Sequence, residues 1–121
     1  MTRNPIVKLK VWQVSVNFVV KLYKALENLP AQERFGLRSQ LQRAAVSIPS
    51  NIAEGAARKH TKELIQFLYV ARGSISELDT QLEICLRVGY LEKAVHEHFS
   101  TKLEEISKML NGLIISLAKK L

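Results

Sequence analysis

The sequence predicts an all-α protein, an antiparallel up-down-up-down four-helix bundle. Apolar residues recur at spacings of three and four in four stretches, and strict alternation is absent over any useful length. The chain has 5 Gly and 3 Pro in 121 residues, too few for a turn-rich β fold. The connections between the stretches are short, which makes sequential helices antiparallel neighbours. This length fits a single domain over residues 1–121.

Turn signals divide the chain into helices over approximately residues 7–28, 31–58, 61–88 and 92–120. Pro30 ends the first helix, because proline disfavours a helical conformation in the residue before it and cannot donate an N–H. Thr61 is the expected N-cap of the third helix. Gly89 can adopt the left-handed conformation that ends a helix. Pro49 predicts a kink within the second helix.

Three helices each carry one recognisable core stripe. In the first helix the predicted stripe is Trp12, Val16, Val19, Tyr23 and Leu26, with Phe18 and Leu22 beside it. In the third it is Leu64, Leu68, Ala71, Ile75, Leu78, Leu82 and Cys85, and in the fourth Phe99, Leu103, Ile106, Leu110, Leu113 and Leu117. Each stripe follows the helical period and is expected to face the bundle core.

The second helix has two apolar sides. Its core stripe is Leu37, Leu41, Ala44, Ile48 and Ile52, and a second set about 120° away is Phe35, Val46, Ala53 and Ala57. A helix with two apolar sides needs two partners. One is the core of its own bundle, and the other is expected to be another subunit.

No catalytic, cofactor or metal site is predicted, so the chain is not expected to be an enzyme. His96 and His98 are two positions apart and point about 160° away from each other on a helix. Cys85 shares a face with Leu78 and Leu82, which is typical of an inert core thiol. The glycines are isolated, so the chain has no phosphate-binding glycine loop.

The sequence favours a cytoplasmic protein without a membrane partner. No apolar run reaches the roughly 20 residues that span a bilayer, and the opening residues do not resemble a signal peptide. The chain contains 1 Cys, which cannot form an internal disulfide.

The net charge of +7 is unevenly distributed. Residues 1–60 hold ten Lys/Arg and three Asp/Glu, whereas residues 61–121 hold eight of each. This asymmetry favours an anionic partner, and residues spaced along helices can neutralise successive phosphates. The candidate nucleic-acid-binding residues are Lys10, Lys21, Lys24, Arg58, Lys59 and Lys62. The alternative is a surface charge that only maintains solubility.

A polar stripe on the second helix is expected to meet polar residues of the third. The candidate network comprises Arg43, Asn51, Glu54, Glu77 and Gln81. Such groups can be buried only when they are paired, and a paired network fixes the register of the two helices. The alternative is a solvated face.

One series of residues resembles a known family. It runs from Leu29-Pro30 and Glu33-Arg34-Phe35-Gly36-Leu37 to Asn51-Ile52-Ala53-Glu54-Gly55, and continues with Ala71-Arg72-Gly73-Ser74 and Met109-Leu110-Asn111-Gly112-Leu113. This series is similar to the bacterial four-helix-bundle family encoded within intervening sequences of large-subunit ribosomal RNA genes. Asn51-Ile52-Ala53-Glu54-Gly55 is its most specific part.

The resemblance implies a ring-like homopentamer with no catalytic residues. A related protein, the accessory variability determinant of diversity-generating retroelements, shares the bundle and binds nucleic acid and a reverse transcriptase. A reverse-transcriptase-like partner for this chain is an analogy only. The leading hypothesis is a non-catalytic, oligomeric accessory protein that binds nucleic acid, RNA in preference, through phosphates. The alternative is an oligomeric protein–protein scaffold with no nucleic-acid role.

Overall fold

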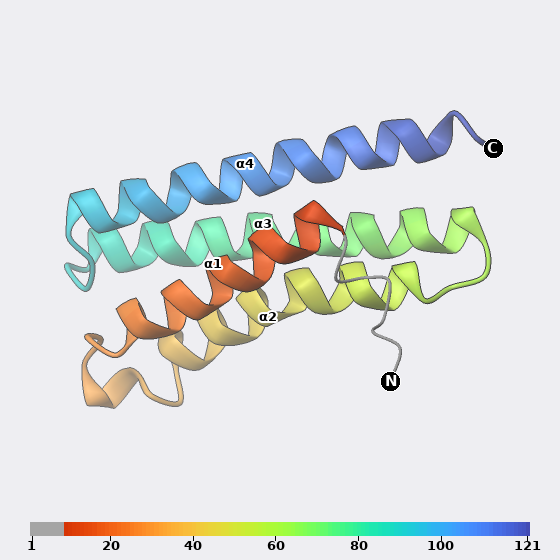
Figure 1. The fold of residues 1–121 in the computed structure, drawn as a ribbon. Helices are drawn as coiled ribbons and strands as arrows, with labels where there is room; N and C mark the ends of the chain where they lie inside the picture. The colour runs from red at the N-terminus through yellow and green to blue at the C-terminus, as the bar shows by residue number, and fades with distance from the viewer. Residues whose placement is uncertain (1–8) are drawn as a thin grey trace.

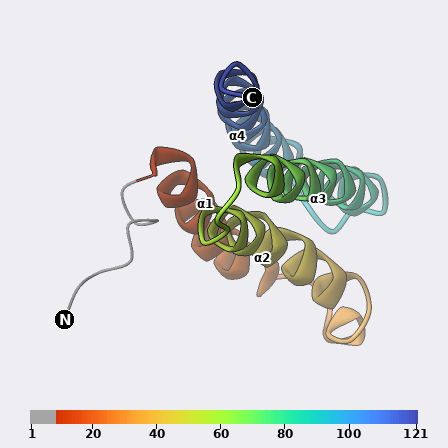
Figure 2. The same cartoon turned by 90° about the vertical axis from the view of Figure 1, so that its right-hand side faces the viewer.

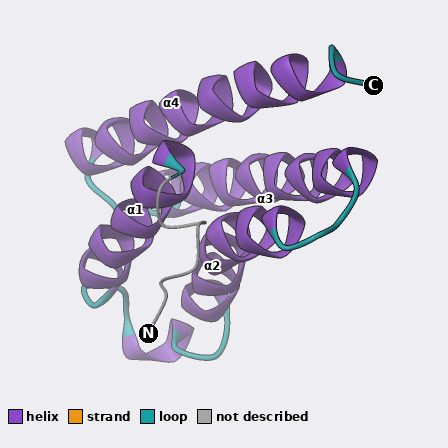
Figure 3. Ribbon diagram, turned by 45° about the vertical axis from the view of Figure 1, so that its right-hand side comes forward, coloured by secondary structure: helices purple, strands orange, loops and turns teal. Residues whose placement is uncertain are grey.

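The protein is all-helical over residues 9–121, the part of the chain that the computed structural model describes. Its α-helices are α1 (Lys10–Leu26), α2 (Leu37–Ala56), α3 (Thr61–Arg87) and α4 (Lys93–Ala118), and a 3-10 helix, η2 (Ala31–Glu33), precedes α2. These residues contain no strand, and short loops join the helices (Figure 3). The four helices are consistent with the predicted four-helix bundle. The predicted start of the first helix at residue 7 lies outside the described residues.

The helices pack very unequally. α2 and α3 make the most extensive contact, and α1 and α4 make the smallest among the four pairs that pack side by side. Seen end-on, α2 lies against α3, α1 lies beside α2, and α4 lies beside α3 (Figure 2). The α2–α3 turn and the end of α4 lie at one end of the molecule, and the α1–α2 and α3–α4 connections lie at the other (Figure 1). This arrangement determines which charged residues lie at the same end of the molecule.

Buried side chains from all four α-helices form one apolar cluster. The predicted stripe of α3 is confirmed from Leu68 to Cys85, and that of α2 from Leu41 to Ile52. In α4 the stripe is confirmed from Phe99 to Leu110, after which Ile114 is buried and the predicted Leu113 is only partly buried.

In α1 the prediction of Leu26 as a core residue is confirmed, but Trp12, Val16, Val19 and Tyr23 each lie one position after a buried residue. The buried residues are Val11, Ser15, Phe18, Leu22 and Leu26, whereas Tyr23 is 40% exposed. The apolar residues of α1 occupy several sides of the helix, so periodicity alone did not identify the buried one. The polar Ser15 made the buried side harder to recognise from the sequence. Its hydroxyl is fully buried and donates a hydrogen bond to the Trp12 carbonyl oxygen at 2.9 Å.

The second predicted helix begins later than expected. Gly36 has φ −105° and ψ −114°, outside the helical region, so η2 and α2 are separate elements. The Glu33 carboxylate accepts a hydrogen bond from the Leu37 N–H at 3.2 Å and so caps α2. α2 then continues through the buried Pro49. At the next turn the cap is His60 rather than the predicted Thr61, which is the first residue of α3.

The chain reversal after α3 follows the sequence prediction. Gly89 has φ +86°, the left-handed conformation that glycine adopts at little cost. The Tyr90 N–H donates to the Cys85 carbonyl oxygen at 2.8 Å, which closes the end of the helix. None of the helices in the described residues combines the length and the apolar character needed to cross a lipid bilayer.

Candidate nucleic-acid interface

The α2–α3 turn presents a compact group of basic side chains. Arg58, Lys59, His60 and Lys62 are all exposed. Arg58 is held in place, because its guanidinium lies 2.8 Å from a Glu54 carboxylate oxygen and 4.8 Å from the centre of the Phe67 ring. Lys59 and Lys62 have no ion pair with any other residue of the described chain. Their charges are therefore available to an anionic partner.

The end of α4 adds two cations that the sequence analysis missed. Lys119 and Lys120 are exposed and follow α4 at the same end of the molecule as the α2–α3 turn (Figure 1). Leu121 lines one surface hollow together with Lys62, which brings the two segments together. We call Arg58, Lys59, Lys62, Lys119 and Lys120 the basic end. The up-down order of the helices could have predicted that residues 58–62 and residues 119–120 lie at the same end of the bundle.

The remaining predicted basic residues lie elsewhere. Lys21 and Lys24 are exposed near the end of α1, at the opposite end of the molecule from the α2–α3 turn (Figure 1). Lys10 is exposed at the first position of α1. The six candidates therefore do not form one surface. Only Arg58, Lys59 and Lys62 are brought together.

The predicted polar network does not form as one unit within a single chain. The Asn51 amide donates to the carbonyl oxygen of Ser47 at 2.8 Å and to its hydroxyl at 2.9 Å. The Ser47 hydroxyl also lies 2.8 Å from that of Ser74, so the link between α2 and α3 is made by two serines. Glu54 is 57% exposed and pairs with Arg58.

The other three members of that set have no partner in residues 9–121. Arg43 and Glu77 are exposed and form no ion pair there. Gln81 is only 8% exposed, and its side-chain oxygen accepts no hydrogen bond from the described residues. A buried amide oxygen without a donor costs about 1–3 kcal/mol, and the Gln81 oxygen is covered by its own chain.

Cys85, His96 and His98 lie apart from the basic end, whereas His60 belongs to the α2–α3 turn. Burial raises the pKa of the Cys85 thiol to about 11, with a smaller contribution from the Glu33 charge. His96 is largely buried, with its Nε2 3.5 Å from a Glu83 carboxylate oxygen, and His98 is exposed. Within the described residues, no three His, Cys, Asp or Glu side chains are grouped so that they could hold a metal ion.

Comparison with known proteins assigns the family. The family model for the 23S rRNA-intervening sequence protein matches residues 7–112. A crystal structure from Bacteroides thetaiotaomicron, described as a protein of unknown function from the S23 ribosomal protein family, is similar in fold with a TM-score of 0.76. The two chains share 30% sequence identity over 86% of this chain and 97% of that one. No curated protein matches the chain. The chain belongs to the family of 23S rRNA-intervening sequence proteins.

Proposed function

We propose that the protein is a non-catalytic accessory protein that binds nucleic acid through the phosphate backbone. The observation that carries this proposal is the basic end, where Lys59, Lys62, Lys119 and Lys120 have no ion pair within the described residues. Glu63 is the one acidic residue in the first turn of α3. Several unpaired cations on one end of a helical bundle are suited to neutralising neighbouring phosphates.

RNA is the favoured ligand. The description of the family names the intervening sequence of a 23S rRNA, and that of the similar crystal structure names a ribosomal protein family. Both descriptions support an association with RNA. The cytoplasm is the proposed place of action, and the single, buried and unpaired Cys85 is consistent with a reducing compartment.

We further propose that antiparallel bundles assemble into a ring-like homo-oligomer, a pentamer by resemblance to the family. The outer face of α3 carries the exposed apolar residues Val70, Ile84 and Val88. The unpartnered Gln81 lies on the same side by helical spacing. A second copy placed there would cover this apolar surface. Assembly would also repeat the basic end around the ring, which multiplies the field that attracts a polyanion.

Fluorescence anisotropy with a structured RNA and a matched DNA duplex, titrated at several salt concentrations, tests the nucleic-acid proposal. The variant Lys59→Glu/Lys62→Glu is compared with Lys93→Glu/Lys108→Glu, which changes the total charge equally on α4, away from the basic end. We expect the first variant to bind at least tenfold more weakly. The slope of its log affinity against log salt concentration should also become shallower by about two. An equal loss in both variants would show that only net charge matters.

Sedimentation velocity tests the assembly. Arg43→Glu and Glu77→Arg are each expected to weaken it, because both charged groups lack a partner within the described chain and would meet across the contact. The exchange of both charges in one protein should restore assembly if the two side chains pair between copies. A wild-type protein that assembles but binds no nucleic acid would favour the protein–protein scaffold. A monomer at all concentrations would contradict the ring.

A further inference from the structure

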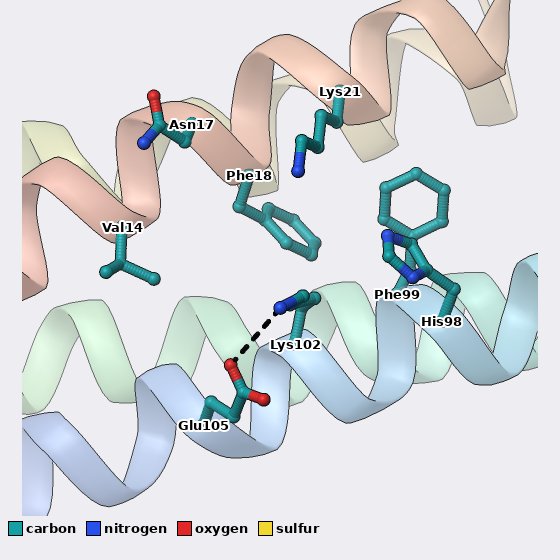
Figure 4. Close-up of a pocket in the computed structure, with 8 residues that line it drawn as sticks. All are labelled: Val14, Asn17, Phe18, Lys21, His98, Phe99, Lys102 and Glu105. Carbon is teal, nitrogen blue, oxygen red and sulfur yellow. Dashed lines mark ion pairs between the residues drawn. The ribbon is translucent and has the colours of Figure 1, made fainter.

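Because α1 and α4 make only a small contact, a groove lies between them. Its lining residues do not belong to the basic end. Figure 4 shows Phe18 and Lys21 on α1 facing His98, Phe99 and Lys102 on α4. The hollow has a volume of about 230 Å³, which is below the roughly 300–1,000 Å³ of small-ligand sites. We call this hollow the α1–α4 groove.

The floor of the groove is aromatic. The Phe18 and Phe99 ring centres lie 5.6 Å apart with their planes at 87°, an edge-to-face pair. The His98 ring meets Phe99 edge-on at 5.3 Å and is exposed. Phe18 and Phe99 are almost fully buried, so a ligand would meet mainly the exposed His98 ring.

Cations extend from both walls of the groove. In Figure 4, Lys21 extends from α1 and Lys102 from α4, with the Phe18 ring between them. Lys21 has no ion pair within the described residues, and Lys102 lies 3.6 Å from Glu105, its one acidic partner. Both members of that pair are about half exposed, so the pair is weak and Lys102 can turn to another anion. The groove thus combines aromatic rings with two lysines and one carboxylate, that of Glu105.

We infer that the α1–α4 groove holds one unpaired nucleotide of a single strand. The base would lie against the His98 ring and the edges of Phe18 and Phe99, while the flanking phosphates lie within reach of Lys21 and Lys102. Aromatic contact and phosphate neutralisation together are how proteins bind single strands without reading their sequence. Asn17, which also lines the groove, can both donate to and accept from a base edge. The inference rests on the proposed function and adds a second, strand-selective site at a distance from the basic end.

Anisotropy titrations with a six-nucleotide single-stranded RNA and with a twelve-base-pair RNA duplex test this inference. The variant Lys21→Gln/Lys102→Gln is compared with Lys24→Gln/Lys108→Gln, which removes the same charge from α1 and α4 outside the groove. We expect the groove variant to weaken single-strand binding at least tenfold and duplex binding less than twofold. The control variant should change both by less than twofold.

A second comparison addresses the base. An abasic residue at the central position of the single strand should weaken binding to the wild type by about tenfold. His98→Ala should reduce that difference, since His98 is exposed and its loss spares the core. An abasic strand that binds as tightly as the intact one would overturn the inference.

The outcomes separate the two proposals. If the wild type binds the duplex but the groove and control variants are indistinguishable on the single strand, the inference fails and the basic end stands. If the wild type binds neither RNA, both proposals fail. If Lys21→Gln/Lys102→Gln changes the sedimentation coefficient, the groove is a contact between copies and the inference is overturned.

Discussion

Gly55 on α2 lies directly against Phe67 on α3, with no room for a side chain between them. A Cβ added to Gly55 would lie 2.8 Å from the Cβ of Phe67 and 3.2 Å from the Leu64 carbonyl oxygen. Neither atom belongs to the flexible end of a side chain, so the two helices would have to separate. The absence of a side chain at this position therefore permits the close approach of α2 and α3.

Replacing Gly55 tests this approach. Alanine normally stabilises a helix interior by about 1 kcal/mol relative to glycine, but the overpacking cost here is about 1–3 kcal/mol. We expect Gly55→Ala to lower the free energy of unfolding, measured by urea denaturation. Gly112→Ala on α4 is the matched control, because a Cβ there meets nothing within 4 Å. It should raise stability by up to about 1 kcal/mol, and a gain at both positions would refute the tight contact.

The serine link between α2 and α3 should be measurable as a coupling. Ser47 and Ser74 are 27 positions apart, and their hydroxyl oxygens lie 2.8 Å from each other. In a double-mutant cycle with Ser47→Ala and Ser74→Ala, we expect a coupling energy of about 0.5–1.5 kcal/mol from urea denaturation. Ser50→Ala, an exposed position on α2, is the control and should show no coupling to Ser74→Ala. Additive effects of Ser47→Ala and Ser74→Ala would mean that the bond contributes nothing.

Tyr90 joins the α3–α4 turn to η2 and should titrate at high pH. Its hydroxyl donates to a Glu33 carboxylate oxygen at 2.9 Å, and this hydrogen bond raises the pKa of Tyr90 above its ordinary value of 10.0. The neutral phenol is favoured in the folded state, so the contribution to stability is full below pH 10 and is lost as the pH rises through the folded pKa.

Absorbance at 295 nm of the wild type minus that of Tyr90→Phe would report this titration. The difference curve should have its midpoint above pH 10, and Glu33→Gln should move the midpoint down because it removes the negative acceptor. A midpoint at or below 10 in the wild type would contradict the hydrogen bond.

Cys85 should be unreactive in the folded protein. Its thiol is buried, and burial followed by the Glu33 charge raises its pKa to about 11. Alkylation by iodoacetamide at pH 8 should be slow in buffer and fast in denaturing urea, because the thiolate is the reactive species. The unfolded thiol ionises near pH 9, so this group lowers folding stability as the pH rises from about 9 towards 11. Rapid alkylation in buffer would show that the end of α3 opens readily.

The sequence predicted the helical architecture because its signals are local. The stripe from Leu68 to Cys85 has one apolar side, and Gly89 marks a turn that needs a positive φ. In α1 the same reasoning failed, because valines occupy several sides and a buried serine lies on the true core side. Periodicity identifies the buried side only when the other sides are polar.

The candidate sites were less predictable because they depend on tertiary placement. Lys119 and Lys62 are far apart in sequence, and only the packing of α4 brings them to the same end of the molecule. Arg43 and Gln81 were expected to belong to one polar network within the chain, yet neither has a partner in residues 9–121. The spacing of polar residues along a helix shows that they share a side, but it does not show what covers that side.

The unequal packing of the helices has a consequence for how the protein folds and fluctuates. α2 and α3 are consecutive in the chain and make the largest contact, so they can form a hairpin early through local contacts. α1 and α4 are the first and last helices of the chain, and they contact each other least. Amide protons of α1 and α4 should therefore exchange with solvent through partial openings that leave the central hairpin intact. If these openings occur, the groove between α1 and α4 widens to admit a ligand while the hairpin that supports it stays folded.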